Sequence, residues 1–218
     1  MPKNPNVIDY HDQMIIAHAV VASVATLITA PAAILIGRYF RSRSWWFKVH
    51  VLLQSVTAVF VILVFSLGIV AVGSGGNGNQ LTGPKMDPHH DLGLAVLVLF
   101  LLQFVLGIGA HYTHSASPAH AKDPAFPTMT TPKSALRHLH VVCGVVMTAL
   151  LYAGVKTGMD EWDMVSDMGT LVPQPVVVLY WVIFGFEVAA YFFGWVMEPI
   201  RASRSRPSSI DEREKVPA

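Results

Sequence analysis

Four histidines in apolar surroundings are the residues of this chain most suited to chemistry. The chain has ten histidines, and His18, His50, His89 and His140 stand within or at the start of long apolar segments. An imidazole in such a place is costly unless it is hydrogen-bonded or ligated. Neutral imidazole is a common ligand of transition metals. A single histidine of this kind is more often a packing residue, so only the arrangement of the four can indicate whether they are metal ligands.

The segments that hold these histidines predict an all-α membrane protein. The composition, 53% hydrophobic and 13% charged, is that of a chain built for lipid. Crossing a bilayer takes about 20 apolar residues in a helix, since backbone amides there must be bonded internally. Five segments qualify, at residues 14–37, 49–73, 91–110, 134–155 and 176–197. We therefore expect five transmembrane helices with loops between them, one of them an acidic loop over residues 160–167.

The distribution of cations predicts the orientation. The connection between the first two spans carries four cations and no acid: Arg38, Arg41, Arg43 and Lys48. By the positive-inside rule this connection is cytosolic. The N-terminal segment, residues 1–13, is then extracytoplasmic, the transmembrane domain covers residues 14–197, and residues 198–218 are a disordered cytosolic tail. The plasma membrane is the first expectation and an internal organelle the second.

The antiparallel course of the spans places the histidines at matched depths. His18 is expected level with His89, and His50 level with His140, because successive spans reverse direction. Facing imidazoles on neighbouring helices of a bundle are what bis-histidine haem ligation requires. With about 1.5 Å per residue and roughly 15 residues between the levels, the two irons would be 20 to 25 Å apart. The pattern predicts a four-helix di-haem core with the fifth, C-terminal helix at its periphery.

Small residues near these histidines agree with a flat ligand, although they also serve ordinary close packing of helices in membranes. The residues four positions later, on the same helix face, are Ala22, Gln54, Gly93 and Gly144, and three of these are small. A small residue there lets a macrocycle approach the backbone.

Several neighbouring positions leave alternatives open. His90 and His138 each lie close to a proposed ligand, and either could replace it or donate to a haem propionate. Glu187 is the only acid deep in a span, and the sequence assigns it no role. The remaining histidines are expected to be solvated or interfacial: His11, His111, His114 and His120.

Other function classes lack support in the sequence. The single cysteine, Cys143, excludes an intramolecular disulfide and leaves no thiolate metal cluster. A net charge of +1 provides no basic field for a nucleic acid. No P-loop, dinucleotide fingerprint, nucleophile elbow or zinc motif is present.

The histidine pattern resembles the cytochrome b561 family, especially fungal members related to the membrane part of proteins that carry an extracellular DOMON domain. The third span carries the most specific piece, in which His89 precedes Gly93 and Gln103 precedes Gly107. The fourth span repeats the His-x-x-x-Gly element at His140. The resemblance covers about residues 14–197.

The resemblance implies two b-type haems, each held by one histidine pair, and it favours His89 over His90 and His140 over His138. It also implies electron transfer from a cytosolic ascorbate-like reductant to an extracytoplasmic ferric chelate or monodehydroascorbate, as in a transmembrane oxidoreductase. The chain shows no DOMON domain, so a separate extracellular redox protein is one expected partner, besides lipid, small-molecule donor and acceptor, and a second copy in a homodimer.

Two competing hypotheses come from other classes. A membrane haem-binding sensor would need an axial position that opens, whereas four matched histidines predict two closed sites. A haem-free scaffold or transporter would pair the histidines with water and neighbouring helices, and it would bind no haem.

Overall fold

The computed structural model describes residues 8–75, 88–115, 132–165 and 171–204, which are almost entirely helical and contain no strand. The first span is made of α1 (Tyr10–Val24), a π-helical turn η1 (Ala25–Thr29) and α2 (Ala30–Tyr39). It is followed by α3 (Trp46–Ser74), α4 (Pro88–Ser115), α5 (Pro132–Val165) and α6 (Gln174–Arg204). The expected all-α fold is therefore confirmed.

Within the described residues, five helical spans are long and apolar enough to cross a membrane: Tyr10–Tyr39, Trp46–Ser74, Pro88–His111, Ala135–Met164 and Gln174–Gly194. Each contains most or all of one predicted segment, so the chain is an integral, multi-pass membrane protein. The predicted loop over residues 160–167 is wrong in its first part, because α5 continues to Val165. An ion pair between Lys156 and Asp160, one helical turn apart, accompanies this extension. Likewise, α6 continues to Arg204, beyond the predicted end at residue 197.

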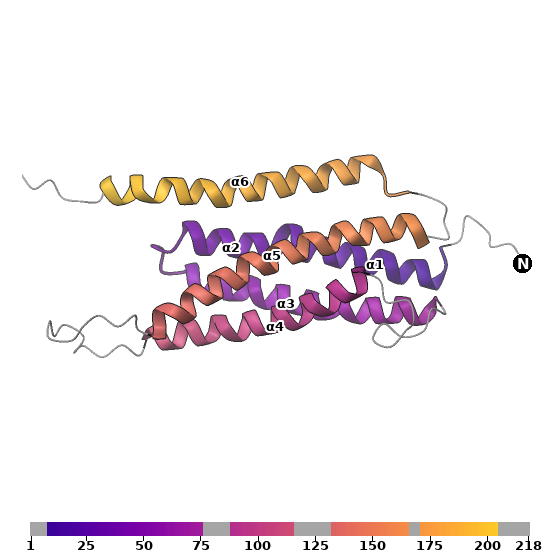
Figure 1. The fold of residues 1–218 in the computed structure, drawn as a ribbon, viewed down its shortest axis with the longest axis horizontal. Coiled ribbons are helices and arrows are strands. Elements are labelled where there is room, and N and C mark those ends of the chain that lie inside the picture. Colours follow the sequence, from indigo (N-terminus) through magenta and orange to yellow (C-terminus); the bar gives the residue numbers. More distant parts are fainter. Residues whose placement is uncertain (1–7, 76–87, 116–131, 166–170, 205–218) are drawn as a thin grey trace, which may run out of the picture.

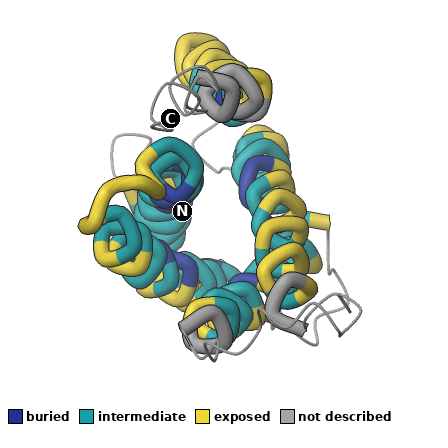
Figure 2. The backbone as a smooth tube through the Cα atoms, turned by 90° about the vertical axis from the view of Figure 1, so that its left-hand side faces the viewer, coloured by how far each residue is buried: buried dark blue, intermediate teal, exposed yellow. Residues whose placement is uncertain are grey.

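The first four spans form a bundle, with α6 outside it (Figure 1). Around the bundle the first span packs on α3, α3 on α4 and α4 on α5, and α5 returns to the first span. The end view shows this closed arrangement, with α6 apart at the top (Figure 2). The first span and α4 are therefore diagonal to each other, and so are α3 and α5. The predicted peripheral C-terminal helix is confirmed.

A small apolar core fills the bundle between its two ends. Its buried members come from all four spans: Ala30, Val61, Phe100, Met147 and Leu151. Large apolar side chains on the outer faces are exposed, such as Val105 and Phe186 at 64% and 69%. That pattern suits a bundle whose solvent is lipid and whose interior is closed by packing.

The π-helical turn is a feature that the hydrophobic pattern did not predict. Pro31 lacks an N–H and its ring disturbs the carbonyl four residues earlier, which is a recognised cause of local helix widening. The N–H of Ala30 bonds instead to the carbonyl of Ala25, five residues back. Thr29 in this turn then bonds to Thr57 of α3, with 2.8 Å between the two hydroxyl oxygens. Thr57 is completely buried, so this bond joins the first two spans inside the bundle.

Polar contacts dock α6 and give Glu187 a partner. The hydroxyl of Tyr152 on α5 donates to the carboxylate of Glu187. The hydroxyl of Tyr180 on α6 donates to the backbone carbonyl of Tyr152 at 2.9 Å. Nearer the other end of α6, the hydroxyl of Tyr39 donates to the carbonyl of Ala190. The one acid deep in a span thus lies in the contact between the bundle and its peripheral helix.

Candidate functional site

His18 and His89 meet across the diagonal of the bundle. His18 lies on α1 and His89 in the first turn of α4. Their ring centroids are 5.9 Å apart and the ring planes differ by 76°. Two imidazoles bound to one metal place their nitrogens about 4 Å apart and their ring centres roughly 6 Å apart, given metal–nitrogen bonds of about 2.0 Å. The separation therefore suits a shared axial ligation.

The hydrogen bonds of His18 and His50 fix which ring nitrogen is available. The Nδ1 of His18 lies 2.8 Å from the carbonyl oxygen of Val64 on α3. The Nδ1 of His50 lies 2.8 Å from the carbonyl oxygen of Ala33 on α2. A carbonyl only accepts, so Nδ1 must be the protonated, donating nitrogen in both neutral rings. The lone pair is then on Nε2, which is the arrangement typical of metal-bound histidines.

The Nδ1 atom of His89 is also engaged by a neighbouring helix, but by a side chain and not by a backbone carbonyl. Its Nδ1 is 3.0 Å from the hydroxyl oxygen of Thr157 on α5. That hydroxyl donates its single hydrogen to the carbonyl of Gly154 at 3.2 Å. When the hydroxyl hydrogen lies on that carbonyl, the Thr157 oxygen accepts from the histidine and Nδ1 is the donor, as in His18 and His50.

His140 is held differently, by packing against α4. A β-carbon built on Gly107 would lie 2.9 Å from the Cε1 atom of His140, so the ring rests directly on the glycine backbone. The backbone carbonyl of His140 accepts a 2.7 Å bond from the Nε2 of Gln103. Within the described residues the Nδ1 of His140 and the Oε1 of Gln103 are both buried without a hydrogen-bond partner. This end of the bundle holds polar atoms that the protein alone does not satisfy.

His50 and His140 form the second diagonal pair, on α3 and α5. They lie near enough to interact electrostatically. The ring of His50 rests against Gly37, where a β-carbon would lie 3.4 Å from Nδ1.

Glycines on neighbouring helices, more than those on the histidines' own helices, accommodate the rings. Gly37, Gly107 and Gly158 face His50, His140 and His89 respectively. The expected role of Gly144 is not what its contacts show, because a β-carbon there would meet Gln103 at 2.9 Å. Sequence spacing along a single helix carries no signal for contacts that depend on how each helix is rotated against its neighbour.

The contacts with neighbouring helices also measure the spacing of the two levels. His18 is bonded to Val64 on α3, so Val64 marks the depth of His18 along that helix. Val64 lies 14 positions after His50 on α3, which is about 21 Å at 1.5 Å per residue. His140 rests on Gly107 of α4, and from His89 to Gly107 is a difference of 18 positions, or about 27 Å.

The two alternative ligands differ in position. His90 lies beside His89, and its Nε2 is 3.4 Å from a carboxylate oxygen of Glu161 on α5. The other oxygen of Glu161 is 3.9 Å from the Nε2 of His89. Of the two histidines, His89 is the one whose ring contacts that of His18.

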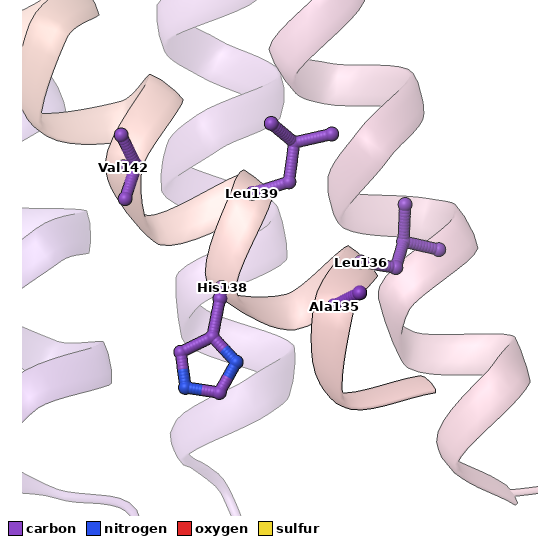
Figure 3. Close-up of a pocket in the computed structure, with 5 residues that line it drawn as sticks. All are labelled: Ala135, Leu136, His138, Leu139 and Val142. Carbon is purple, nitrogen blue, oxygen red and sulfur yellow. The ribbon is translucent and has the colours of Figure 1, made fainter. Parts of the chain in front are cut away.

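His138 is exposed, whereas His140 is partly buried in the bundle. Figure 3 shows His138 in a shallow, mostly apolar recess on the surface of α5. The recess is lined by residues of this helix alone: Ala135, Leu136, His138, Leu139 and Val142. An exposed ring on the outer face of one helix has no opposing histidine.

Two of the histidines that were expected to be solvated or interfacial, His11 and His111, differ in how far they are buried. His11 is partly buried, and its Nδ1 bonds to the carbonyl of Ala71 at 2.9 Å, so the expectation for it is wrong. His111 is exposed and stacks on Phe47, with 3.8 Å between centroids. The side chain of His114 and all of His120 lie outside the described residues.

Taken as a site, the facing imidazoles are the residues that could hold a metal-centred group between the helices. The rings are anchored from neighbouring helices, and glycines adjoin three of them. Unsatisfied polar atoms remain beside His140. Comparison of the chain with protein-family models, with curated proteins and with solved structures gave no match.

Proposed function

We propose that this protein is a transmembrane electron carrier that holds two b-type haems, one between His18 and His89 and one between His50 and His140. The observation that supports the proposal is the contact between the rings of His18 and His89, whose Nδ1 atoms are engaged by Val64 of α3 and Thr157 of α5 respectively. Bound haem supplies reversible one-electron chemistry between ferric and ferrous iron.

The residues of the chain hold and orient this group. Val64 and Ala33 keep His18 and His50 in the tautomer that offers Nε2, and Thr157 holds the ring of His89 from α5. Gly107 and Gly158 leave room for His140 and His89 against the next helix. The apolar core between the two levels excludes water, so charge can cross the bundle without a continuous aqueous path.

The direction of transfer is part of the proposal. The cationic connection between α2 and α3 favours a cytosolic position for the His50 end. An ascorbate-like reductant on that side would supply electrons. A ferric chelate or monodehydroascorbate outside would accept them, as the resemblance to cytochrome b561 implies. The plasma membrane is the proposed location.

The first test is a reduced-minus-oxidised absorption spectrum with haem quantitation on the full chain purified in detergent. We expect about two b-type haems per chain. His89→Ala and His140→Ala should each lose one of them. His11→Ala is the matched control, because His11 also bonds to a backbone carbonyl through Nδ1 but is not one of the four paired histidines.

The outcomes separate the hypotheses. A well-folded wild type that takes up no haem refutes the carrier and leaves a scaffold or transporter. A five-coordinate ferrous centre that binds carbon monoxide would favour the sensor, because it requires an axial position that opens. Loss of haem in His11→Ala equal to that in His89→Ala would mean that the paired geometry does not select the ligands.

A further inference from the structure

Each of the four histidines is supported by a neighbouring helix, but the chemistry of the support differs. His18 and His50 donate to backbone carbonyls. His140 rests on a glycine. The ring of His89 instead contacts side chains, the hydroxyl of Thr157 at its Nδ1 and, at 3.9 Å, the carboxylate of Glu161 at its Nε2. The support from Thr157 can be removed by a substitution that leaves the backbone in place and adds no atom against the ring.

We propose that Thr157 is a positioning residue that sets the electronic character of the iron ligand His89. The inference rests on the proposed function, since it concerns haem held by His18 and His89. A metal-bound imidazole that donates from its second nitrogen becomes a stronger base toward the metal, and its ring orientation is fixed. Stronger donation stabilises ferric iron over ferrous iron, which lowers the reduction potential.

The geometry makes Thr157 a well-oriented acceptor. Its hydroxyl oxygen lies 3.0 Å from the Nδ1 of His89 and 3.2 Å from the carbonyl oxygen of Gly154, so a hydroxyl that donates to the carbonyl has a lone pair left to accept from the ring. The same ring lies against Gly158, where a β-carbon would be 3.0 Å from Cε1. The face of α5 from Gly154 to Gly158 thus contacts both the edge and the polar nitrogen of this histidine.

The experiment compares three variants of the full chain loaded with haem. Thr157→Val removes the acceptor at nearly constant volume, and Thr157→Ser restores it. Thr148→Val is the matched control, because Thr148 is also partly buried on α5 and donates to the carbonyl of Gly144 at 2.8 Å, and within the described residues it makes no hydrogen bond to a histidine. The readouts are haem content, the two midpoint potentials from a redox titration followed by absorbance, and the electron paramagnetic resonance spectrum of the ferric haems.

We expect Thr157→Val to raise one midpoint potential and change one of two ferric signals, with the other centre unaltered. Thr157→Ser should return both to wild-type values, and Thr148→Val should shift neither. A Thr157→Val protein with two haems and wild-type potentials overturns the inference while leaving the proposed function intact. Equal shifts in Thr148→Val would also overturn it, since the effect would then be structural. A wild type without haem would refute the proposed function itself.

Discussion

Replacing Gly107 by alanine tests the site at the point where the contact is closest. The added β-carbon would lie 2.9 Å from Cε1 and 3.4 Å from Nδ1 of His140. Ordinary contacts between carbon atoms are about 3.5–4.0 Å, so the ring or the helix must retreat by about 0.6 Å or more. Binding constellations tolerate errors of about 0.5 Å before they lose function.

The expected magnitude follows from this displacement. Overpacking of one methyl group costs about 1–3 kcal/mol. If that cost falls on the ligated state, haem binds between His50 and His140 roughly 5- to 150-fold more weakly, since 1.4 kcal/mol is tenfold. Haem titration of the apoprotein, followed by absorbance, should then show one unchanged site and one weakened site.

The control is Gly185→Ala on α6. A β-carbon at Gly185 meets nothing within 4 Å, and alanine in a helix is favoured over glycine by about 1 kcal/mol. This variant should keep two haems and be at least as stable as the wild type. If Gly107→Ala binds both haems with wild-type affinity, the contact between Gly107 and His140 does not constrain the ligand and the reasoning fails.

Two further predictions concern stability. Tyr152→Phe removes the donor to Glu187 in an apolar setting, so the free energy of unfolding in detergent should fall by about 1–3 kcal/mol without loss of haem. Adding Glu187→Leu should recover part of this loss of stability. Unchanged stability of Tyr152→Phe would show that this bond does not hold α6. Thr57→Val breaks the buried bond to Thr29 and should cost about 1 kcal/mol in a denaturant titration, with Thr57→Ser nearer to wild type. A Thr57→Val protein as stable as the wild type would mean that the interhelical bond contributes nothing.

The spans and the depths of the histidines were predictable because both depend on distance along a helix. A length of apolar chain fixes where a helix crosses lipid, and a constant rise fixes the level of His18 or His140. Rotation about the helix axis is set by packing between helices, so the sequence did not reveal that Gly107 supports His140 or that Gly144 faces Gln103. The partial burial of His11 is of the same kind, since it depends on a contact with α3, whereas the widened turn before Pro31 has its cause in a residue that the sequence shows.

The position of the two histidine levels explains why the bundle needs no large opening. Along the helices the levels are about 21 to 27 Å apart, while the hydrocarbon layer is about 30 Å thick. In the proposed carrier each pair would then lie close to one face of the membrane, within reach of a soluble donor or acceptor. Between the pairs stand Val61, Phe100 and Met147, which are buried and apolar. On the proposed function, such an interior would separate two fixed centres by apolar side chains, so that an electron could cross while larger solutes could not.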